Sequence, residues 1–137
     1  MKRNHFALGA FMFAMGVAMG ALGAHGLEGK ISEHYLDVWK KASEYWMYSA
    51  LGTMSVTAFV HNKDQNEALA HSFFRFGGLL TWAIFGTFIF SISLWVLAMN
   101  ELWGSGLKKL GMITPIGGVM MIVAWVLMGL KVLKINR

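Results

Sequence analysis

The chain lacks cysteine, contains a single proline and has few charged residues. Without cysteine it has neither a disulfide framework nor a thiolate metal site, and cysteine usage indicates no redox compartment. Charged residues make up 14% of the 137 residues and hydrophobic residues 56%, whereas about a quarter of a soluble domain is charged. This balance is typical of a protein whose solvent is a lipid bilayer. The length suits one domain covering residues 1–137.

Sequence motifs for enzymatic chemistry are absent as well. The chain has no nucleophile elbow, P-loop, dinucleotide fingerprint or H-E-x-x-H zinc motif. Its formal net charge of +5 does not indicate nucleic-acid binding, because Lys and Arg lie beside apolar runs instead of forming one basic stripe. Phospholipid headgroups are the expected partners of these cations. We therefore expect no enzymatic activity, no nucleic-acid partner, no cofactor and no metal.

Four apolar runs dominate the sequence, at about residues 6–24, 45–61, 76–99 and 110–130, and none contains Asp, Glu, Lys or Arg. Crossing roughly 30 Å of hydrocarbon takes about 20 apolar residues as a helix, so the first, third and fourth runs suffice alone. The second is marginal unless its helix starts within residues 40–44. A bilayer satisfies no free backbone group, so the sequence predicts an all-α, up-and-down bundle of four transmembrane helices. We expect the first run to be an uncleaved span, because it exceeds a typical signal-peptide core.

Apolar residues also recur at helical spacing between the first two runs. This pattern predicts an amphipathic helix at about residues 32–44 that lies along the membrane interface before the chain turns into the second span. The stripe comprises Leu27, Ile31, Tyr35, Val38, Ala42 and Tyr45. Aromatic residues near the same membrane boundary predict an interfacial belt. Its members are Tyr35, Trp39, Tyr45, Trp46, Trp95 and Trp103.

The distribution of cations predicts the orientation in the membrane. The side shared by the two termini and the second loop carries seven Lys and Arg residues, and the opposite side carries five. The positive-inside rule therefore places both termini in the cytoplasm. The first group is Lys2, Arg3, Lys63, Arg75, Lys131, Lys134 and Arg137, and the second is Lys30, Lys40, Lys41, Lys108 and Lys109.

Small residues indicate where helices approach one another closely. Gly16 and Gly20 form a G-x-x-x-G pair, Gly23 follows, and Gly117 and Gly118 open the fourth run. Such ridges allow close packing where lipid supplies no hydrophobic drive for association. We expect the ridge of the first run to pack inside the monomer, with self-association as the alternative. Alanines form a neighbouring ridge at Ala10, Ala14, Ala18 and Ala21.

One group of polar residues converges at the membrane face opposite the termini. Its members are His25, Glu44, Tyr45, Tyr48, Asn100, Glu101 and Thr114. A structural clasp, such as His25 bonded to Glu44 or to a backbone carbonyl, is the first interpretation. A ligand or proton-handling site is the alternative, because ionisable groups at membrane depth are costly to leave unpaired. Neither a haem held by two histidines nor a zinc site at His25, His34 and Glu44 has a recognisable ligand spacing.

Three segments together resemble a known family. They are G-A-L-G-A-H-G-L at residues 20–27, W-K-K-A-S-E-Y-W-M-Y at residues 39–48 and G-M-I-T-P-I-G-G at residues 111–118. In order and spacing they are similar to the YgdD-like family, also called the transmembrane protein 256, UPF0382 or DUF423 family. The resemblance implies a four-helix protein of the bacterial inner membrane with no established activity. Relatives often place His directly after the tyrosine that matches Tyr48, whereas this chain has Ser49, which weakens a two-histidine site.

Three functions agree with these features. The first is a non-enzymatic accessory or scaffold protein that binds other membrane components, as a homo-oligomer or as a subunit of a larger membrane complex. The second is a small-solute or ion translocator that uses the polar cluster as a gate, although no ionisable residue reaches the middle of a span. The third is a haem- or quinone-associated electron-transfer subunit.

Overall fold

The structure is a computed structural model, which describes the backbone of residues 2–63, 67–104 and 111–135 and the side chains of residues 4–60, 77–104 and 111–134. These residues form helices and no strand, which confirms the all-α prediction. The elements are α1 (Lys2–Ala21), the π-helix η1 (Leu22–Gly26), α2 (Glu33–Lys63), α3 (Glu67–Ala98), α4 (Asn100–Trp103) and α5 (Thr114–Ile135).

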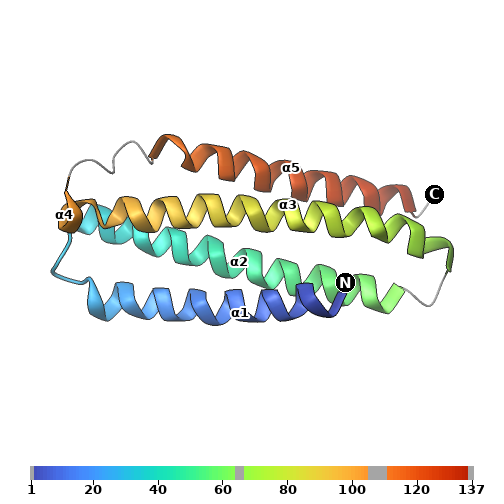
Figure 1. Ribbon diagram of the computed structural model, residues 1–137, viewed down its shortest axis with the longest axis horizontal. Helices are drawn as coiled ribbons and strands as arrows, with labels where there is room; N and C mark the ends of the chain where they lie inside the picture. Colours follow the sequence, from blue (N-terminus) through green and yellow to red (C-terminus); the bar gives the residue numbers. More distant parts are fainter. Residues whose placement is uncertain (1, 64–66, 105–110, 136–137) are drawn as a thin grey trace.

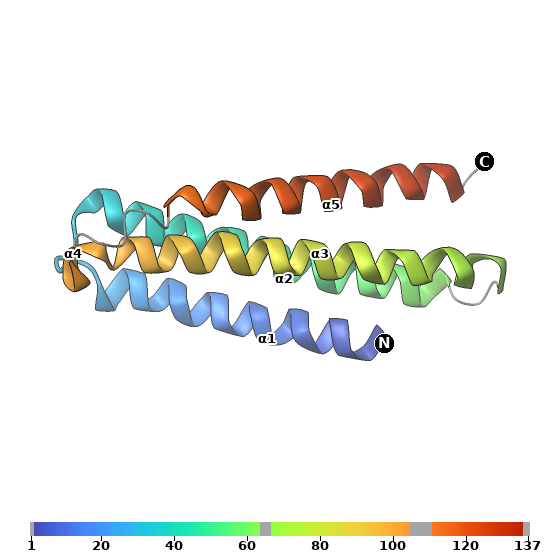
Figure 2. The same ribbon diagram turned by 45° about the horizontal axis from the view of Figure 1, so that its top comes forward.

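The four long helices lie side by side and alternate in direction (Figure 1). α1 packs on α2, α2 on α3, and α3 on α5. Two views place α1 and α5 on opposite sides of the α2–α3 pair (Figure 1, Figure 2). Both chain termini lie at one end of the molecule, called here the terminal end, and α4 lies at the other, the α4 end. α1 and α3 therefore run in the same direction.

Three helical stretches of the described residues are long and apolar enough to cross a membrane. They are Asn4–Gly26, Gly77–Ala98 and Thr114–Lys134. They fall on the first, third and fourth of the predicted runs. α2 is not among them, although its 31 residues correspond to a helix about 46 Å long.

Charged residues in its first three turns and buried hydroxyls further along lower the hydropathy of α2. The Ser and Thr side chains of its inner face are at most 6% exposed, because α2 lies between α1 and α3. Two of these hydroxyls donate to carbonyls of the same helix, from Ser43 to Trp39 O at 3.1 Å and from Thr57 to Thr53 O at 2.7 Å. Internal bonds of this kind satisfy polar groups without water. The buried hydroxyls of α2 belong to Ser43, Ser49, Thr53 and Thr57.

The sequence predicted an interfacial helix at about residues 32–44 followed by a turn into the second span, and the prediction of that turn is wrong. Residues 33–63 form one continuous helix. Part of the apolar stripe faces the bundle, whereas Tyr45 is 46% exposed. Leu27, Ile31 and Ala42 are 5, 7 and 0% exposed. The periodicity was correctly helical, but periodicity alone does not distinguish a lipid-facing stripe from a protein-facing one.

Glycines at seven-residue intervals bring α1 close to α2. A Cβ atom added to Gly16 would lie 2.5 Å from Met47 Cγ, and one added to Gly9 would lie 3.1 Å from the carbonyl oxygen of Ala50. At Gly23 the added atom would lie 2.6 Å from Trp39 Cδ1. The glycines therefore provide the space that α2 side chains occupy.

The contact between α3 and α5 is closer, because backbone meets backbone. A Cβ atom on Gly117 would lie 2.6 Å from both Gly86 O and Phe90 N. Gly118 is in ordinary contact with the Phe90 ring, at 3.6 Å. Gly20, by contrast, has no such atom within 4 Å, so it takes no part in helix packing within the chain.

Candidate functional site

Three tryptophans form the centre of the bundle. Trp39 and Trp46 of α2 and Trp95 of α3 are 4, 1 and 4% exposed. The ring centroids of Trp46 and Trp95 are 5.1 Å apart, and those of Trp39 and Trp95 are 6.1 Å apart. The prediction that these three belong to an interfacial belt is therefore wrong. Tyr45 and Trp103, at 46 and 66% exposed, do lie on the surface.

Hydrogen bonds from the indoles explain how large amphipathic rings are accommodated in the core. Trp46 Nε1 donates to Met12 O at 2.6 Å, and Trp39 Nε1 donates to Met19 O at 2.7 Å, so two indoles of α2 bind carbonyls of α1. Trp95 Nε1 donates to Ser43 Oγ at 3.1 Å, which ties α3 to α2. Because each ring N–H has a partner, burying the rings leaves no donor unsatisfied.

A signal for this cluster was present in the sequence. Trp39 and Trp46 are seven residues apart, as are Gly16 and Gly23, and seven residues are two helical turns. The matching intervals place each indole opposite a glycine of α1. Gly23 also lies in η1, where Leu27 N donates to Leu22 O at 3.0 Å.

At the α4 end, the side chain of Glu101 caps the N-terminus of α2. Its carboxylate accepts the backbone N–H of Ser32 at 2.6 Å, while Ser32 O accepts from Leu36 N at 2.9 Å as the first carbonyl of the helix. A carboxylate at a helix N-terminus is favoured by the helix dipole and by the free N–H groups there. This contact joins residues 69 positions apart and fixes α4 against α2.

Asn100 lies beside this contact and is 6% exposed. Its Nδ2 donates to Tyr35 Oη at 3.4 Å, whereas its Oδ1 is buried without a hydrogen-bond partner among the described residues. Gly104 ends α4 with a φ of 105°, a conformation that favours glycine. Asn100 and Glu101 are thus brought to the start of α2, as parts of a joint between helices.

The remaining members of the predicted cluster do not join them. His25 and Glu44 are both exposed, and no hydrogen bond connects them in the described part of the chain, so the expected clasp is absent. Tyr45 and Tyr48 are exposed, with ring centroids 6.1 Å apart, and Tyr45 contacts the Phe90 ring at 5.2 Å. The cluster is therefore divided: Asn100 and Glu101 lie in one place, Tyr45 and Tyr48 in a second and Thr114 in a third, while His25 and Glu44 bond to none of them.

Thr114 occupies the third place, inside the α3–α5 contact. Its hydroxyl lies 2.8 Å from Ser93 Oγ, and both residues are at most 9% exposed. Ser93 Oγ also lies within hydrogen-bond distance of Phe90 O, at 2.9 Å. The pair fastens the start of α5 to α3, as interhelical hydroxyl bonds do in membrane proteins.

An exposed ion pair on α2 shifts the pKa values of both of its members. Lys41 Nζ lies 2.6 Å from Asp37 Oδ2, one helical turn away. The hydrogen bond from Lys41, followed by its positive charge, lowers the pKa of Asp37. The same bond and the carboxylate charge raise the pKa of Lys41. Both side chains are more than half exposed, so the pair contributes little to stability.

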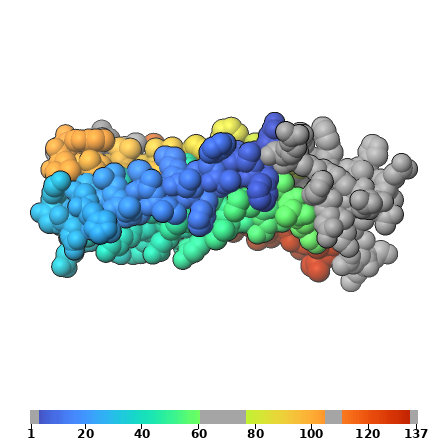
Figure 3. Space-filling model, turned by 90° about the horizontal axis from the view of Figure 1, so that it is seen from below, coloured from blue at the N-terminus to red at the C-terminus, as the bar shows by residue number. Residues whose placement is uncertain are grey.

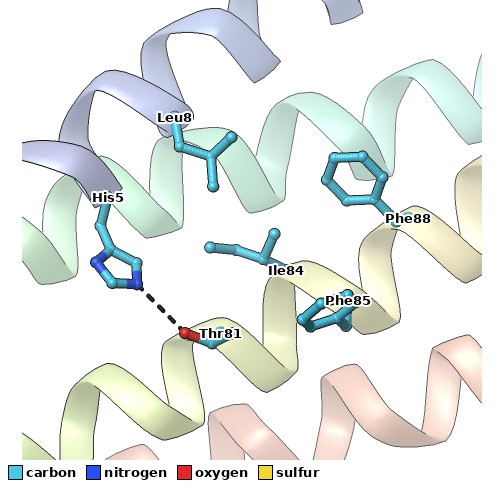
Figure 4. A pocket seen from close by; sticks show the side chains of 6 residues that line it. All are labelled: His5, Leu8, Thr81, Ile84, Phe85 and Phe88. Atoms are coloured by element: carbon cyan, nitrogen blue, oxygen red, sulfur yellow. Dashed lines mark hydrogen bonds between the residues drawn. The ribbon is translucent and has the colours of Figure 1, made fainter.

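Near the terminal end a groove of about 300 Å³ opens between α1 and α3, with α2 behind it (Figure 4). His5 Nε2 lies 3.3 Å from Thr81 Oγ1 and bridges the two helices at one end of the groove. Thr81 Oγ1 donates its own proton to Gly77 O at 2.8 Å, so it accepts from His5. The other lining residues are apolar: Leu8, Ile84, Phe85 and Phe88.

The described side chains include no cluster of metal-binding groups. No three His, Asp or Glu side chains within these ranges come together as metal ligands. The buried hydroxyls of Ser43, Thr57 and Thr87 donate to carbonyls of their own helices, and none of them has a general base beside it. These bonds satisfy the buried hydroxyls within their own helices.

Three candidate spans and a core of interhelical contacts define a helical membrane protein. The family model "Protein of unknown function (DUF423)" matches residues 19–118, and the chain belongs to that family, which confirms the resemblance. It is 40% identical to a "UPF0382 membrane protein" of Staphylococcus aureus strain bovine RF122 / ET3-1, over 93% of each chain. It is 39% identical to the UPF0382 membrane protein YwdK of Bacillus subtilis strain 168, over 93% of this chain and 94% of YwdK. No solved structure matches it significantly.

Proposed function

We propose that the chain crosses the bacterial inner membrane four times, with both termini in the cytoplasm. α1 and α3 run in the same direction and each contains a candidate span, so the chain has to return between them. α2 connects the two and packs against both, which supports its crossing the membrane despite its low hydropathy. The larger number of Lys and Arg residues in the segments of the terminal end favours the cytoplasm for that end.

A reporter that is active only outside the cytoplasm tests this topology. Fused after residue 137 it is expected to stay inactive, and fused within residues 105–109 it is expected to be active. Activity at the carboxyl end would overturn the orientation. Activity at both positions would contradict the crossing of α5.

We further propose that the protein is a non-enzymatic accessory or scaffold protein whose α1 binds a second transmembrane helix, from another copy or from another membrane protein. The outward direction of the alanine ridge carries this proposal. Gly9, Gly16 and Gly23 are buried against α2, whereas the alanines of α1 are all exposed on the opposite side of the helix. The exposed alanines are Ala7, Ala10, Ala14, Ala18 and Ala21.

The surroundings of α1 support the proposal. α1 lies along one face of the molecule with no other helix covering it (Figure 3). Only 22% of its candidate span is buried, compared with 44% for that of α3. A ridge of small side chains lets a second helix come close enough for extensive dispersion contacts, which drive helix association in lipid. Larger side chains would serve equally well for contact with lipid alone, so the alanines favour a protein partner.

Cross-linking of the full chain in a mild detergent and in liposomes tests this role. The wild type is expected to give a defined assembly, which Ala14→Leu weakens because the larger side chain separates the helix backbones. Ala58→Leu is the matched control, because Ala58 is exposed on α2 away from the ridge. A persistent monomer, or an equal loss for both variants, would contradict the proposal.

Transport of a small solute is a second candidate, supported by one observation. Ser91 of α3 is 0% exposed, and its Oγ has no hydrogen-bond partner among the described residues. It lies on α3 one helical turn after the buried Thr87, within the predicted third span. A polar solute that passes between the helices would use this buried hydroxyl, so the Ser91→Ala variant is expected to lower solute flux into liposomes. Equal flux for the wild type, this variant and empty liposomes would eliminate the candidate.

A further inference from the structure

The groove between α1 and α3 is polar at one end and apolar along the rest of its length. His5 and Thr81 form the polar end, Leu8 follows on α1, and Ile84 to Phe88 follow on α3 (Figure 4). Because α1 and α3 run in the same direction, both helices place their polar residue nearer the terminal end. From Thr81 to Phe88 the groove extends about 10 Å along the helix axis.

This order matches the depth profile of one membrane leaflet. Thr81 lies four residues inside the candidate span that starts at Gly77, and His5 is the second residue of the span that starts at Asn4. The polar pair therefore lies close to the membrane boundary and the apolar residues lie deeper. Ile84 is 6% exposed and forms the base of the groove, whereas Phe85, at 60% exposed, stands at its edge. An amphipathic molecule with its polar part at the boundary would meet matching surfaces along its length.

The charge around the polar end selects the kind of amphipathic molecule. Lys2 and Arg3 belong to the first turn of α1, three and two residues before His5. α1 contains no acidic residue, so its own sequence supplies no counter-charge to these two cations. Such a site favours a phosphate group. The volume of the groove, about 300 Å³, lies at the lower limit of ligand pockets and suits a single chain better than a helix.

We propose that this groove binds one acyl chain of an anionic phospholipid from the leaflet at the terminal end. The acyl chain lies against Leu8, Ile84, Phe85 and Phe88. The glycerol region meets the His5–Thr81 pair, and the phosphate lies beyond it toward the terminal end, where the sequence of α1 carries two cations. The site is separate from the alanine ridge, so it is occupied whether or not a second helix binds α1.

Photolabelling of the full chain in phosphatidylcholine nanodiscs tests the site. Traces of phosphatidylglycerol or phosphatidylcholine with a photoreactive acyl chain are added, and labelled peptides are identified by mass spectrometry. We expect phosphatidylglycerol to label residues 5–8 and 81–88 about tenfold more than phosphatidylcholine does, because two cations favour the anionic headgroup. Excess unlabelled phosphatidylglycerol should remove this labelling in the wild type. This competition experiment does not depend on the folding of any variant.

Two variants distinguish binding of the acyl chain in the groove from binding of the lipid headgroup. Leu8→Trp should fill the groove and abolish its labelling, whereas Val17→Trp, on an exposed position of the same helix, should not. Lys2→Gln with Arg3→Gln should remove the preference for phosphatidylglycerol and leave weak labelling by both lipids. Equal labelling of the groove and the outer face of α5 would overturn the proposal, as would displacement of the lipid by a quinone but not by phosphatidylglycerol. Loss of cross-linked assembly in Ala14→Leu without loss of labelling would show that helix docking and lipid binding are independent.

Discussion

Replacement of Gly117 by alanine is the most direct test of the α3–α5 contact. The added Cβ atom would lie 2.6 Å from Gly86 O and 2.6 Å from Phe90 N. Both are backbone atoms of α3, so neither can move aside without displacing the helix. Overpacking of a well-packed interior costs about 1–3 kcal/mol, and contact with backbone places this site at the upper end of that range.

The intrinsic preference of alanine for a helix opposes this cost, by at most about 1 kcal/mol. We therefore expect Gly117→Ala to lower the free energy of unfolding by about 2 kcal/mol. Gly20→Ala is the matched control, because apart from the adjoining backbone of α1 no atom lies within 4 Å of the added methyl group. There the helix preference is unopposed, and stability should stay the same or rise by up to about 1 kcal/mol.

Thermal unfolding in detergent micelles, followed by circular dichroism at a helical wavelength, measures both variants. Gly117→Ala should unfold several degrees below the wild type, and Gly20→Ala should not unfold below it. The same substitution thus has opposite expected effects at two helical glycines. If Gly117→Ala proved as stable as the wild type, direct backbone contact between α3 and α5 would be refuted.

Two further predictions concern the core and the surface. Trp46→Phe removes the N–H bond to Met12 O at 2.6 Å and should lower the free energy of unfolding by about 1–2 kcal/mol; Trp82→Phe, at an exposed position, should change it little, and equal effects would contradict the role of the bond. For the ion pair, Lys41→Met should return the pKa of Asp37 toward its ordinary value in a carboxyl NMR titration, and an unchanged pKa would contradict the assigned cause. Because folding lowers this pKa, the small stabilisation by the ionised carboxylate is complete at neutral pH and lost as the pH falls through the lowered pKa.

The apolar runs predicted the helices well because backbone pairing in lipid leaves few alternatives. The runs at about 6–24, 76–99 and 110–130 correspond to the three stretches that are long and apolar enough to span. The second run was the weakest, and among the described side chains α2 has the most buried hydroxyls. A helix shielded by its neighbours does not need to be apolar, so hydropathy predicts central helices less well than outer ones.

The candidate site was predicted less well, for a related reason. Placing polar residues at the same end of a bundle fixes their depth but not the side of the helix on which they lie. His25 and Glu44 share that end, yet each is exposed without a bond to the other. Glu101 found an unexpected partner in the backbone N–H of Ser32, because the exposed start of a helix attracts a carboxylate. Contacts between a side chain and a distant backbone group cannot be predicted from the order of side chains in the sequence.

The sequence by itself determined the membrane class and the all-helical class, since these follow from composition and from the length of apolar runs. It also placed glycines and tryptophans at matching seven-residue intervals. Only the tertiary structure decided which side of each helix faces protein: Trp39, Trp46 and Trp95 toward the core, the glycines of α1 toward α2 and its alanines outward. Lipid and protein interiors are similarly apolar, so the choice between them depends on shape and on hydrogen-bond partners, which arise only when the helices are packed together.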